Sequence, residues 1–406
     1  MQPSLGQVGP YPIVLSDALF VLLAIAAAVS LANGRLRIAW SNWHMAIAVF
    51  VAASVASALG AGDVWHSLRK VIGTTYLAAL GVLSAHYARD LDMARRIAYA
   101  WIAGAILTTA AAAAGVAMFL AGIGANPFLY GYGSLPAASY PRVMALFVNA
   151  NMLCGYLGAA GGIVLAASGA GWIAPKLARP VFAAIVIVAA LTISPGLGGL
   201  ALAFSLWYAA SIAPLKPRRA RLVRWCGIAA AVVFALGVLV SPTMIQRGMP
   251  RTWNEVEPSS RVLTWIDSVA TFRRHPWLGA GPGADVAHVS YINASQGSEF
   301  LTDAHNTVLS VLAQTGIQGF IAFAVVIGLL IVPMRRSVDV TPAAAWQSGC
   351  ELALIAGFLY PSLSGSFEDA RYVWVLIGMV HAAQHPIVIA GAAPVIERET
   401  GSRRIA

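Results

Sequence analysis

The residues best suited to chemistry stand at the end of one long polar segment, Pro242 to Asp303, in an otherwise apolar chain. His305 follows this segment, where an apolar run resumes, and its imidazole can exchange protons near neutral pH. Asp303 precedes it by two residues and can orient or polarise the ring. Five arginines, which bind phosphate through a planar fork of donors, come before the histidine: Arg247, Arg251, Arg261, Arg273 and Arg274. The pattern predicts acid–base chemistry on an anionic substrate, although a histidine at a helix start can also serve only as a polar cap.

Further polar side chains occur near the ends of apolar segments on the same predicted side: Arg142, Asn149, Asn151, Glu368, Asp369 and Arg371. Charged groups at or near membrane depth usually face a bundle interior or a cavity, so they are candidates for function. A purely structural pair between Arg142 and a carboxylate is an equal alternative. The histidines show no ligand spacing with Cys, Asp or Glu, so we expect no metal and no cofactor.

Residues 259–275 have the pattern of an amphipathic helix lying on the outer membrane surface. Apolar side chains recur there at helical spacing, beside Arg261: Val262, Trp265, Ile266, Val269 and Phe272. Interfacial packing alone is the alternative role for this helix. The cluster Gly279–Gly283 that follows can cradle an anion with its amides, although short glycine clusters are more often plain turns.

The composition indicates an integral membrane protein. Hydrophobic residues make up 59% of the 406 and charged residues 10%, whereas a soluble domain has roughly 25% charged residues. Apolar stretches close to the roughly 20 residues that cross a bilayer recur along the chain: about 12–32, 43–61, 71–88, 97–123, 144–168, 181–193, 199–213, 226–242, 306–334, 342–361 and 372–390. We therefore expect an all-α polytopic fold with about 11–12 transmembrane helices.

Four parts follow from this pattern. They are N-terminal transmembrane helices over 1–241, an extracytoplasmic loop over 242–304, C-terminal transmembrane helices over 305–390 and a cytoplasmic tail over 391–406. Lys and Arg residues number 17 in one alternating set of loops and 9 in the other. The positive-inside rule places the richer set in the cytoplasm and the long loop outside. The net charge of +10 is explained by contact with anionic lipid, and no nucleic-acid module is visible.

In these residues the chain resembles the bacterial O-antigen ligase and O-antigen polymerase superfamily, whose members transfer glycans from polyprenyl-diphosphate carriers. The resemblance covers about residues 140–335 and rests on ordered blocks: Arg142 with Phe147, Asn149 and Asn151; Arg261 with Trp265; Pro276, Leu278, Gly279, Gly281 and Gly283; and His305-Asn306 with Leu309, Gly316, Ile317 and Gly319. It implies a multi-pass protein of the bacterial inner membrane whose active site faces the periplasm.

The resemblance also implies roles for the candidate residues. His305 would act as general base on an acceptor hydroxyl, and Arg261 would neutralise the diphosphate of the lipid-linked donor. The remaining candidates would bind substrate: Arg142, Asn151, Asp303, Glu368 and Arg371. Many members carry an arginine after a serine at a turn between two central spans, whereas this chain has Ser194 to Gly199 there without one. Arg142 or Arg371 would then replace it.

The acceptor is left open by these blocks, which concern the donor. A lipid A–core acceptor would make the chain a ligase, and another lipid-linked glycan would make it a polymerase. A protein hydroxyl is a third acceptor. A transporter of lipid-linked glycans is the alternative from another class, but such proteins usually carry polar groups at mid-membrane and internal repeats.

Overall fold

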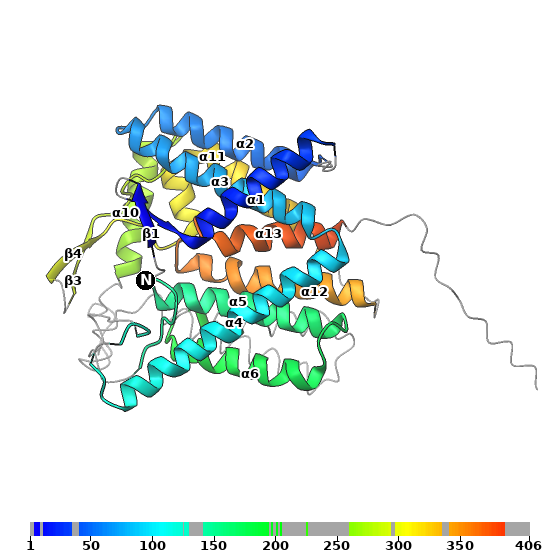
Figure 1. The fold of residues 1–406 in the computed structure, drawn as a ribbon. Helices are drawn as coiled ribbons and strands as arrows, with labels where there is room; N and C mark the ends of the chain where they lie inside the picture. Colours follow the sequence, from blue (N-terminus) through cyan, green and yellow to red (C-terminus); the bar gives the residue numbers. More distant parts are fainter. Residues whose placement is uncertain are drawn as a thin grey trace, which may run out of the picture.

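The computed structural model describes residues 4–8, 11–34, 40–124, 126–129, 141–194, 196–197, 200–201, 204, 225, 260–293, 297–334 and 341–385. The expected spans 226–242 and most of 199–213, the arginines Arg247 and Arg251, and the tail 391–406 lie outside these residues. The described chain folds as a bundle of long helices with two short β-hairpins (Figure 1).

The helices follow one another mostly as antiparallel neighbours: α1 (Leu15–Ala32), α2 (Asn42–Leu59), α3 (Val64–Tyr87), α4 (Leu91–Leu120), α5 (Ala150–Gly169), α6 (Pro175–Leu191), α10 (Ser260–Arg274), α11 (Thr307–Ile331), α12 (Pro342–Leu354) and α13 (Arg371–Gln384). A π-helical turn, η2 (Ile355–Leu359), and a 3₁₀ turn, η3 (Pro361–Leu363), continue α12. The strands β1 (Ser4–Val8) and β2 (Tyr11–Val14) form one antiparallel hairpin, and β3 (Val289–Asn293) and β4 (Gly297–Leu301) form the other.

The predicted all-α polytopic membrane fold is confirmed. Among the described residues, α2, α4, α5 and α11 are long and apolar enough to span a membrane. Large apolar side chains on outward-facing surfaces are exposed, as contact with lipid requires: Leu22, Val49, Ile72, Leu107, Ile187 and Ile321.

Helices from before and after the long loop pack against one another, so the bundle is built from both parts of the chain. α2 contacts α11, α3 contacts α13, and α5 contacts α12 and η2. Glycine allows the last approach to be close: a Cβ on Gly158 would lie 2.7 Å from the carbonyl oxygen of Ala356, and one on Gly162 would lie 2.7 Å from the Cα of Ala353. Small residues at such contacts are what holds helices together in lipid, where apolar burial gives little driving force.

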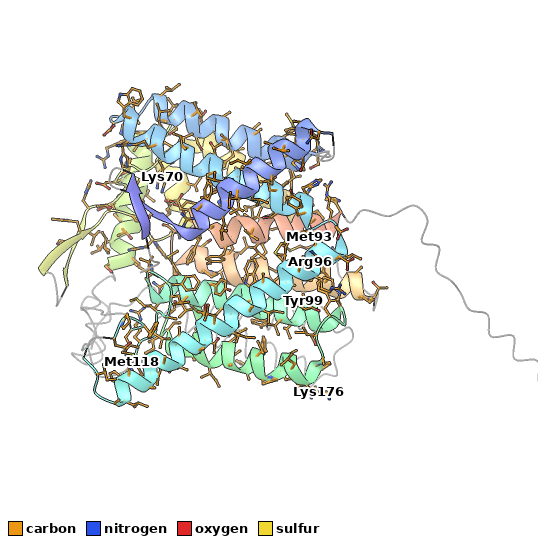
Figure 2. All side chains as sticks on the ribbon, in the orientation of Figure 1. Lys70, Met93, Arg96, Tyr99, Met118 and Lys176 are labelled. Carbon is orange, nitrogen blue, oxygen red and sulfur yellow. The ribbon has the colours of Figure 1, made fainter. Side chains whose placement is uncertain are left out.

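The two ends of the bundle differ. The site end carries α10, the two hairpins and the first turns of α3, α5, α11 and α13 (Figure 1). The opposite end carries the connections 88–90, 170–174 and the last turn of α13. Figure 2 shows Lys70 toward the site end and Arg96 and Lys176 toward the opposite end. The loops that the charge pattern assigned to one membrane side therefore gather at one end.

Several boundaries differ from the predicted spans. α3 begins at Val64 rather than near residue 71 because Asp63 caps it, accepting a hydrogen bond of 2.9 Å from the amide of His66. α5 begins at Ala150 because Asn149 caps it in the same way. The hairpin β3–β4 inside the long loop was not predicted.

Candidate active site

His305 lies in the turn between β4 and α11, in a left-handed backbone conformation with φ of 49°. Such a conformation is strained for a residue with a side chain, and it persists where the surrounding structure enforces it. Asn306 caps α11 by accepting a hydrogen bond of 3.2 Å from the amide of Leu309. The cap and the turn therefore fix where the imidazole stands at the start of α11.

The imidazole of His305 faces the carboxylate of Asp303, with 3.4 Å between Nδ1 and Oδ2. Burial lowers the pKa of His305 below 6.5; Asp303 opposes this shift, and Arg261 adds to it. The ring is thus neutral at pH 7. A proton on Nδ1 directed at Asp303 leaves the lone pair of Nε2 to accept another proton.

Helix α10 is tied directly to the His305 turn. The hydroxyl of Thr264, which is fully buried, shares its one hydrogen between the carbonyl oxygens of Arg261 at 2.8 Å and Ala304 at 3.1 Å. Thr271, two turns further along, donates one of 3.2 Å to the carbonyl oxygen of Val286. Arg261 stands one turn before Thr264, and its charge acts on His305. The predicted amphipathic helix exists, and it brings Arg261 within electrostatic range of the imidazole.

The loop 364–370 docks on the other side of the same turn. Ser366 donates a hydrogen bond of 2.6 Å to Oδ1 of Asp303. The hydroxyl of Thr307 donates to the carbonyl oxygen of Gly365 at 3.1 Å and accepts from the amide of Phe367 at 2.9 Å. Asp303 is therefore held between this loop and His305.

Glu368 in this loop is buried beside α11. Its Oε1 accepts a hydrogen bond from Ser310, while Oε2 has no partner among the described residues. Burial, followed by the charges of Asp369 and Asp303, raises the pKa of Glu368 to about 8. The carboxyl group therefore keeps its proton at neutral pH.

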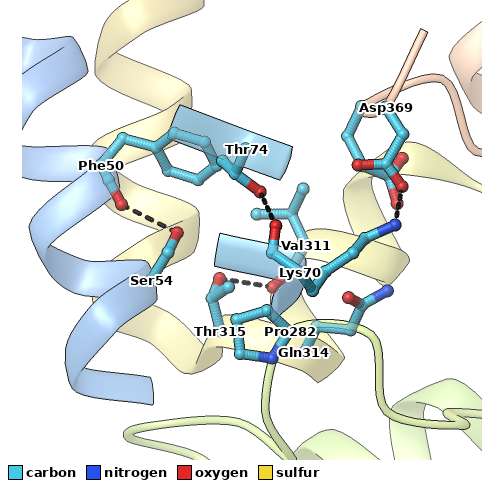
Figure 3. A pocket seen from close by; sticks show the side chains of 10 residues that line it. Phe50, Ser54, Lys70, Thr74, Pro282, Val311, Gln314, Thr315 and Asp369 are labelled. Carbon is cyan, nitrogen blue, oxygen red and sulfur yellow. Dashed lines mark hydrogen bonds and ion pairs between the residues drawn. The ribbon is translucent and has the colours of Figure 1, made fainter. Parts of the chain in front are cut away.

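Lys70 reaches this loop from α3 and forms an ion pair with Asp369. A cavity of about 30 Å³ lies beside the pair, lined among others by Gln314, Thr315 and Glu368 (Figure 3). Lys70 lies between the predicted spans 43–61 and 71–88 and had no predicted role. The sequence signal for this contact is that Lys70 lies on the same predicted membrane side as Glu368 and Asp369.

The glycine cluster is a packed turn rather than an open anion cradle. The amides of Ala280 and Gly281 donate to the carbonyl oxygens of Ala313 and Gln314, each at 2.9 Å. The amide of Gly283 donates to the side chain of Gln314 at 2.7 Å. The cluster holds α10 against the kink of α11 at Gly316, whose φ is 67°.

Arg142 and Asn151 meet at the end of α6. Nε of Arg142 donates to the carbonyl oxygen of Thr192 at 2.9 Å, and Nη2 donates to Oδ1 of Asn151 at 3.4 Å. Arg142 is 7% exposed. Thr192, which Arg142 contacts, is two residues before Ser194. Many members of the family are expected to carry an arginine directly after this serine. Nε of Arg371, at the start of α13, donates a hydrogen bond of 3.2 Å to the hydroxyl of Tyr76.

These features define a multi-pass α-helical membrane protein whose candidate site residues lie at one end of the bundle. A family model described as O-antigen ligase matches residues 153–324, and this match supports the O-antigen ligase superfamily. The family is enzymatic, which supports a ligase- or polymerase-type role in polysaccharide biosynthesis. No curated protein matches the sequence at a significant level. The matched segment contains Arg261, Asp303 and His305.

Proposed function

We propose that this protein transfers a glycan from a polyprenyl-diphosphate carrier to an acceptor hydroxyl at the extracytoplasmic face of the bacterial inner membrane. The observation that carries the proposal is the joining of α10 to the His305 turn, which puts Arg261 and a neutral imidazole together. The family match over residues 153–324 supports the same reaction class.

In the proposed reaction, Nε2 of His305 accepts the proton of the acceptor hydroxyl. The hydroxyl oxygen forms a bond to the anomeric carbon of the glycan, and the bond from that carbon to the diphosphate oxygen breaks. Polyprenyl diphosphate leaves with the bonding electrons, and Arg261 stabilises its growing charge. Asp303 keeps the ring oriented and stabilises the imidazolium. Arginines can supply this stabilisation without a metal ion, so we propose a metal-independent reaction.

Arg142 is proposed to supply the guanidinium that the turn near Ser194 lacks. Its hydrogen bond to Thr192 holds it beside that turn, and Asn151 orients it from α5. Arg371 and Glu368 are proposed to line the donor site from the opposite loop. Lys70 joins them because its ammonium lies beside Asp369 at the same end of the bundle.

The site is proposed to face the periplasm. Over the whole sequence, the loops assigned to the opposite side hold 17 Lys and Arg residues and those of the site side hold 9. The positive-inside rule assigns that opposite side to the cytoplasm. Lipid-linked donors that have been moved to the outer leaflet would then enter beside α10.

Purified protein in liposomes, given a polyprenyl-diphosphate oligosaccharide, separates the acceptor classes. Lipid A–core is offered in one reaction and omitted in another, with EDTA in both. Glycosylated lipid A–core as the only product identifies a ligase, and a ladder formed from donor alone identifies a polymerase. Donor binding without either product points to a protein acceptor or to transport. Loss of transfer in EDTA, restored by added divalent metal, contradicts the metal-independent reaction.

A further inference from the structure

The loop 364–370 contacts the carboxylate of Asp303 through a serine side chain. The hydroxyl of Ser366 donates a hydrogen bond of 2.6 Å to Oδ1 of Asp303. The other oxygen of the same carboxylate, Oδ2, lies 3.4 Å from Nδ1 of His305. Ser366, Asp303 and His305 therefore form a series in which each carboxylate oxygen has its own partner.

The carboxylate of Asp303 needs such a partner to keep one orientation. Rotation of an aspartate carboxylate about its last side-chain bond has broad, roughly two-fold preferences, so the side chain alone does not select the oxygen that faces a neighbour. The side chain of Asp303 is also 43% exposed, so packing leaves this rotation open. The hydrogen bond from Ser366 fixes Oδ1 and thereby directs Oδ2 toward the imidazole.

The orientation of Asp303 decides which nitrogen of His305 carries the proton. A neutral imidazole has one N–H donor and one acceptor nitrogen, and a carboxylate that faces Nδ1 favours the proton on that atom. Nε2 then keeps its lone pair for the acceptor hydroxyl. If the carboxylate turned away, the two tautomers would compete, and some molecules would present an N–H where the base is required.

The loop is docked independently of the Ser366 side chain. The hydroxyl of Thr307 contacts the backbone on both sides of this serine, donating 3.1 Å to the carbonyl oxygen of Gly365 and accepting from the amide of Phe367 at 2.9 Å. Three further pairs hold the rest of the loop to α11, α13 and α3: Ser310 with Glu368, Trp374 with Glu368, and Lys70 with Asp369. Removing the serine hydroxyl would therefore leave the loop in place.

Two simpler roles account less well for this hydrogen bond. Asp303 is exposed enough for water to hydrate its charge, so the carboxylate does not require a donor from the loop. Attachment of the loop is already provided by Thr307 and the other contacts of the loop. A donor that takes Oδ1 and leaves Oδ2 to the imidazole is what orientation of the base requires.

We propose that Ser366 is a positioning residue of the transfer reaction: its hydroxyl holds the carboxylate of Asp303 so that Oδ2 faces Nδ1 of His305. This inference rests on the proposed function, in which Nε2 of His305 accepts the proton of the acceptor hydroxyl. No covalent bond of Ser366 forms or breaks in the reaction. The serine acts through Asp303, so it sets the fraction of molecules with the correct tautomer and affects kcat rather than KM.

Transfer kinetics in liposomes test this role. Ser366→Ala removes the hydroxyl and keeps the charge of Asp303. We expect kcat to fall about tenfold, near the lower end for a hydrogen bond to a charged group because the carboxylate is partly exposed, while KM changes less than about twofold. Ser366→Thr keeps a hydroxyl and should restore most of kcat. Ser364→Ala is the matched control and should keep the wild-type kcat, since that hydroxyl donates 3.4 Å to the carbonyl oxygen of Pro361 within the loop.

The pH profile separates a loss of orientation from a loss of charge. The charges that act on the pKa of His305 are those of Asp303 and Arg261, and Ser366→Ala retains both. The acid limb of kcat/KM should therefore stay at its wild-type position in Ser366→Ala, whereas Asp303→Asn moves it to lower pH. An equal downward shift in the two variants would overturn the proposal, because the serine would then act through charge.

The tautomer of His305 is a readout that requires no transfer activity. NMR of protein labelled with ¹⁵N-histidine in detergent detects the imidazole nitrogens, and the signals of His305 are those that His305→Asn lacks. At pH 7, the neutral ring should carry its proton on Nδ1 in wild type and in Ser366→Thr. Ser366→Ala should show a mixture of the two tautomers.

Failure of this inference is distinguishable from failure of the proposed function. Wild-type transfer by His305→Asn would remove the general base, and the NMR comparison would still show whether Ser366 orients the Asp303–His305 pair. If transfer depends on His305, either a wild-type kcat or a wild-type tautomer in Ser366→Ala overturns the inference and leaves the proposed function standing. A lower kcat with mixed tautomers and an unmoved acid limb supports it.

Discussion

Thr264 and Ala304 are joined by a hydrogen bond of 3.1 Å that ties the helix of Arg261 to the turn of His305. The two partners are 40 residues apart in the chain, and both are fully buried. Because Thr264 is one turn beyond Arg261, the bond sets the height of the guanidinium relative to the imidazole. A cation for the leaving diphosphate of the donor and a base for the acceptor hydroxyl can then act in the same transfer.

Replacing Arg261 with lysine tests the arginine geometry. An ammonium keeps the charge but loses the planar pair of donors, so we expect kcat/KM to fall about 10- to 100-fold, the loss of one or two charge-assisted hydrogen bonds. Arg273→Lys, at an exposed position on the last turn of α10, is the matched control. Equal kcat/KM values in the two variants would remove Arg261 from diphosphate binding.

The acid limb of the pH profile tests the partnership of Asp303 with His305. The neutral imidazole is the active base, so kcat/KM should fall as pH decreases through the pKa of His305, which lies below 6.5. Asp303 raises that pKa, so Asp303→Asn should move the acid limb to still lower pH while reducing the maximal rate. Asp285→Asn, at an exposed position of the same loop, should leave the limb in place. A limb that stays or moves upward in Asp303→Asn contradicts this assignment.

Glu368 should make stability fall as pH rises. Its pKa is about 8 in the folded protein against an ordinary value of 4.5, so the folded state holds the proton more tightly than the unfolded state. The resulting stabilisation is complete below pH 4.5 and is lost as pH rises through about 8. Glu368→Gln mimics the protonated acid and should flatten the decline in unfolding temperature between these values. If the unfolding temperature declines equally with pH in wild type and Glu368→Gln, Glu368 is already ionised in the folded protein and this prediction is wrong.

Gly316 is expected to be the most sensitive glycine of α11. Its φ is 67°, and a Cβ would lie 2.2 Å from the carbonyl oxygen of Trp277. Gly316→Ala should destabilise the protein by about 1–3 kcal/mol or more, since it combines backbone strain with this clash. Gly328→Ala on the same helix meets no atom within 4 Å and should be close to neutral. Denaturation in detergent compares the two, and similar losses would mean that the kink is not enforced.

Local signals predicted the elements that depend on one segment. The stripe from Val262 to Phe272 predicted α10, and the apolar run after His305 predicted α11. The expectation that the candidate residues share one membrane side agrees with their position at one end of the bundle (Figure 1). These predictions succeed because periodicity and charge are recorded in consecutive residues.

Features that depend on distant partners were not predictable. Lys70 pairs with Asp369 across 299 residues, and no local pattern marks such a contact. The backbone and side-chain oxygens of Gln314 accept hydrogen bonds from the amides of Gly281 and Gly283. The residues of the cluster alone therefore could not show that these amides are already paired. The residues on either side of His305, Asp303 and Thr307, contact the loop 364–370, which follows much later in the chain.

The measurement that tests the central claim most directly is single-turnover release of polyprenyl diphosphate by wild type and His305→Asn in liposomes. Asparagine tolerates a left-handed backbone, so the variant should fold and bind donor as wild type does. Without the base, we expect the rate of coupled glycan transfer and diphosphate release to fall about 10²- to 10⁴-fold. Release and transfer at the wild-type rate in His305→Asn would contradict the account, because the imidazole would then take no part in the reaction.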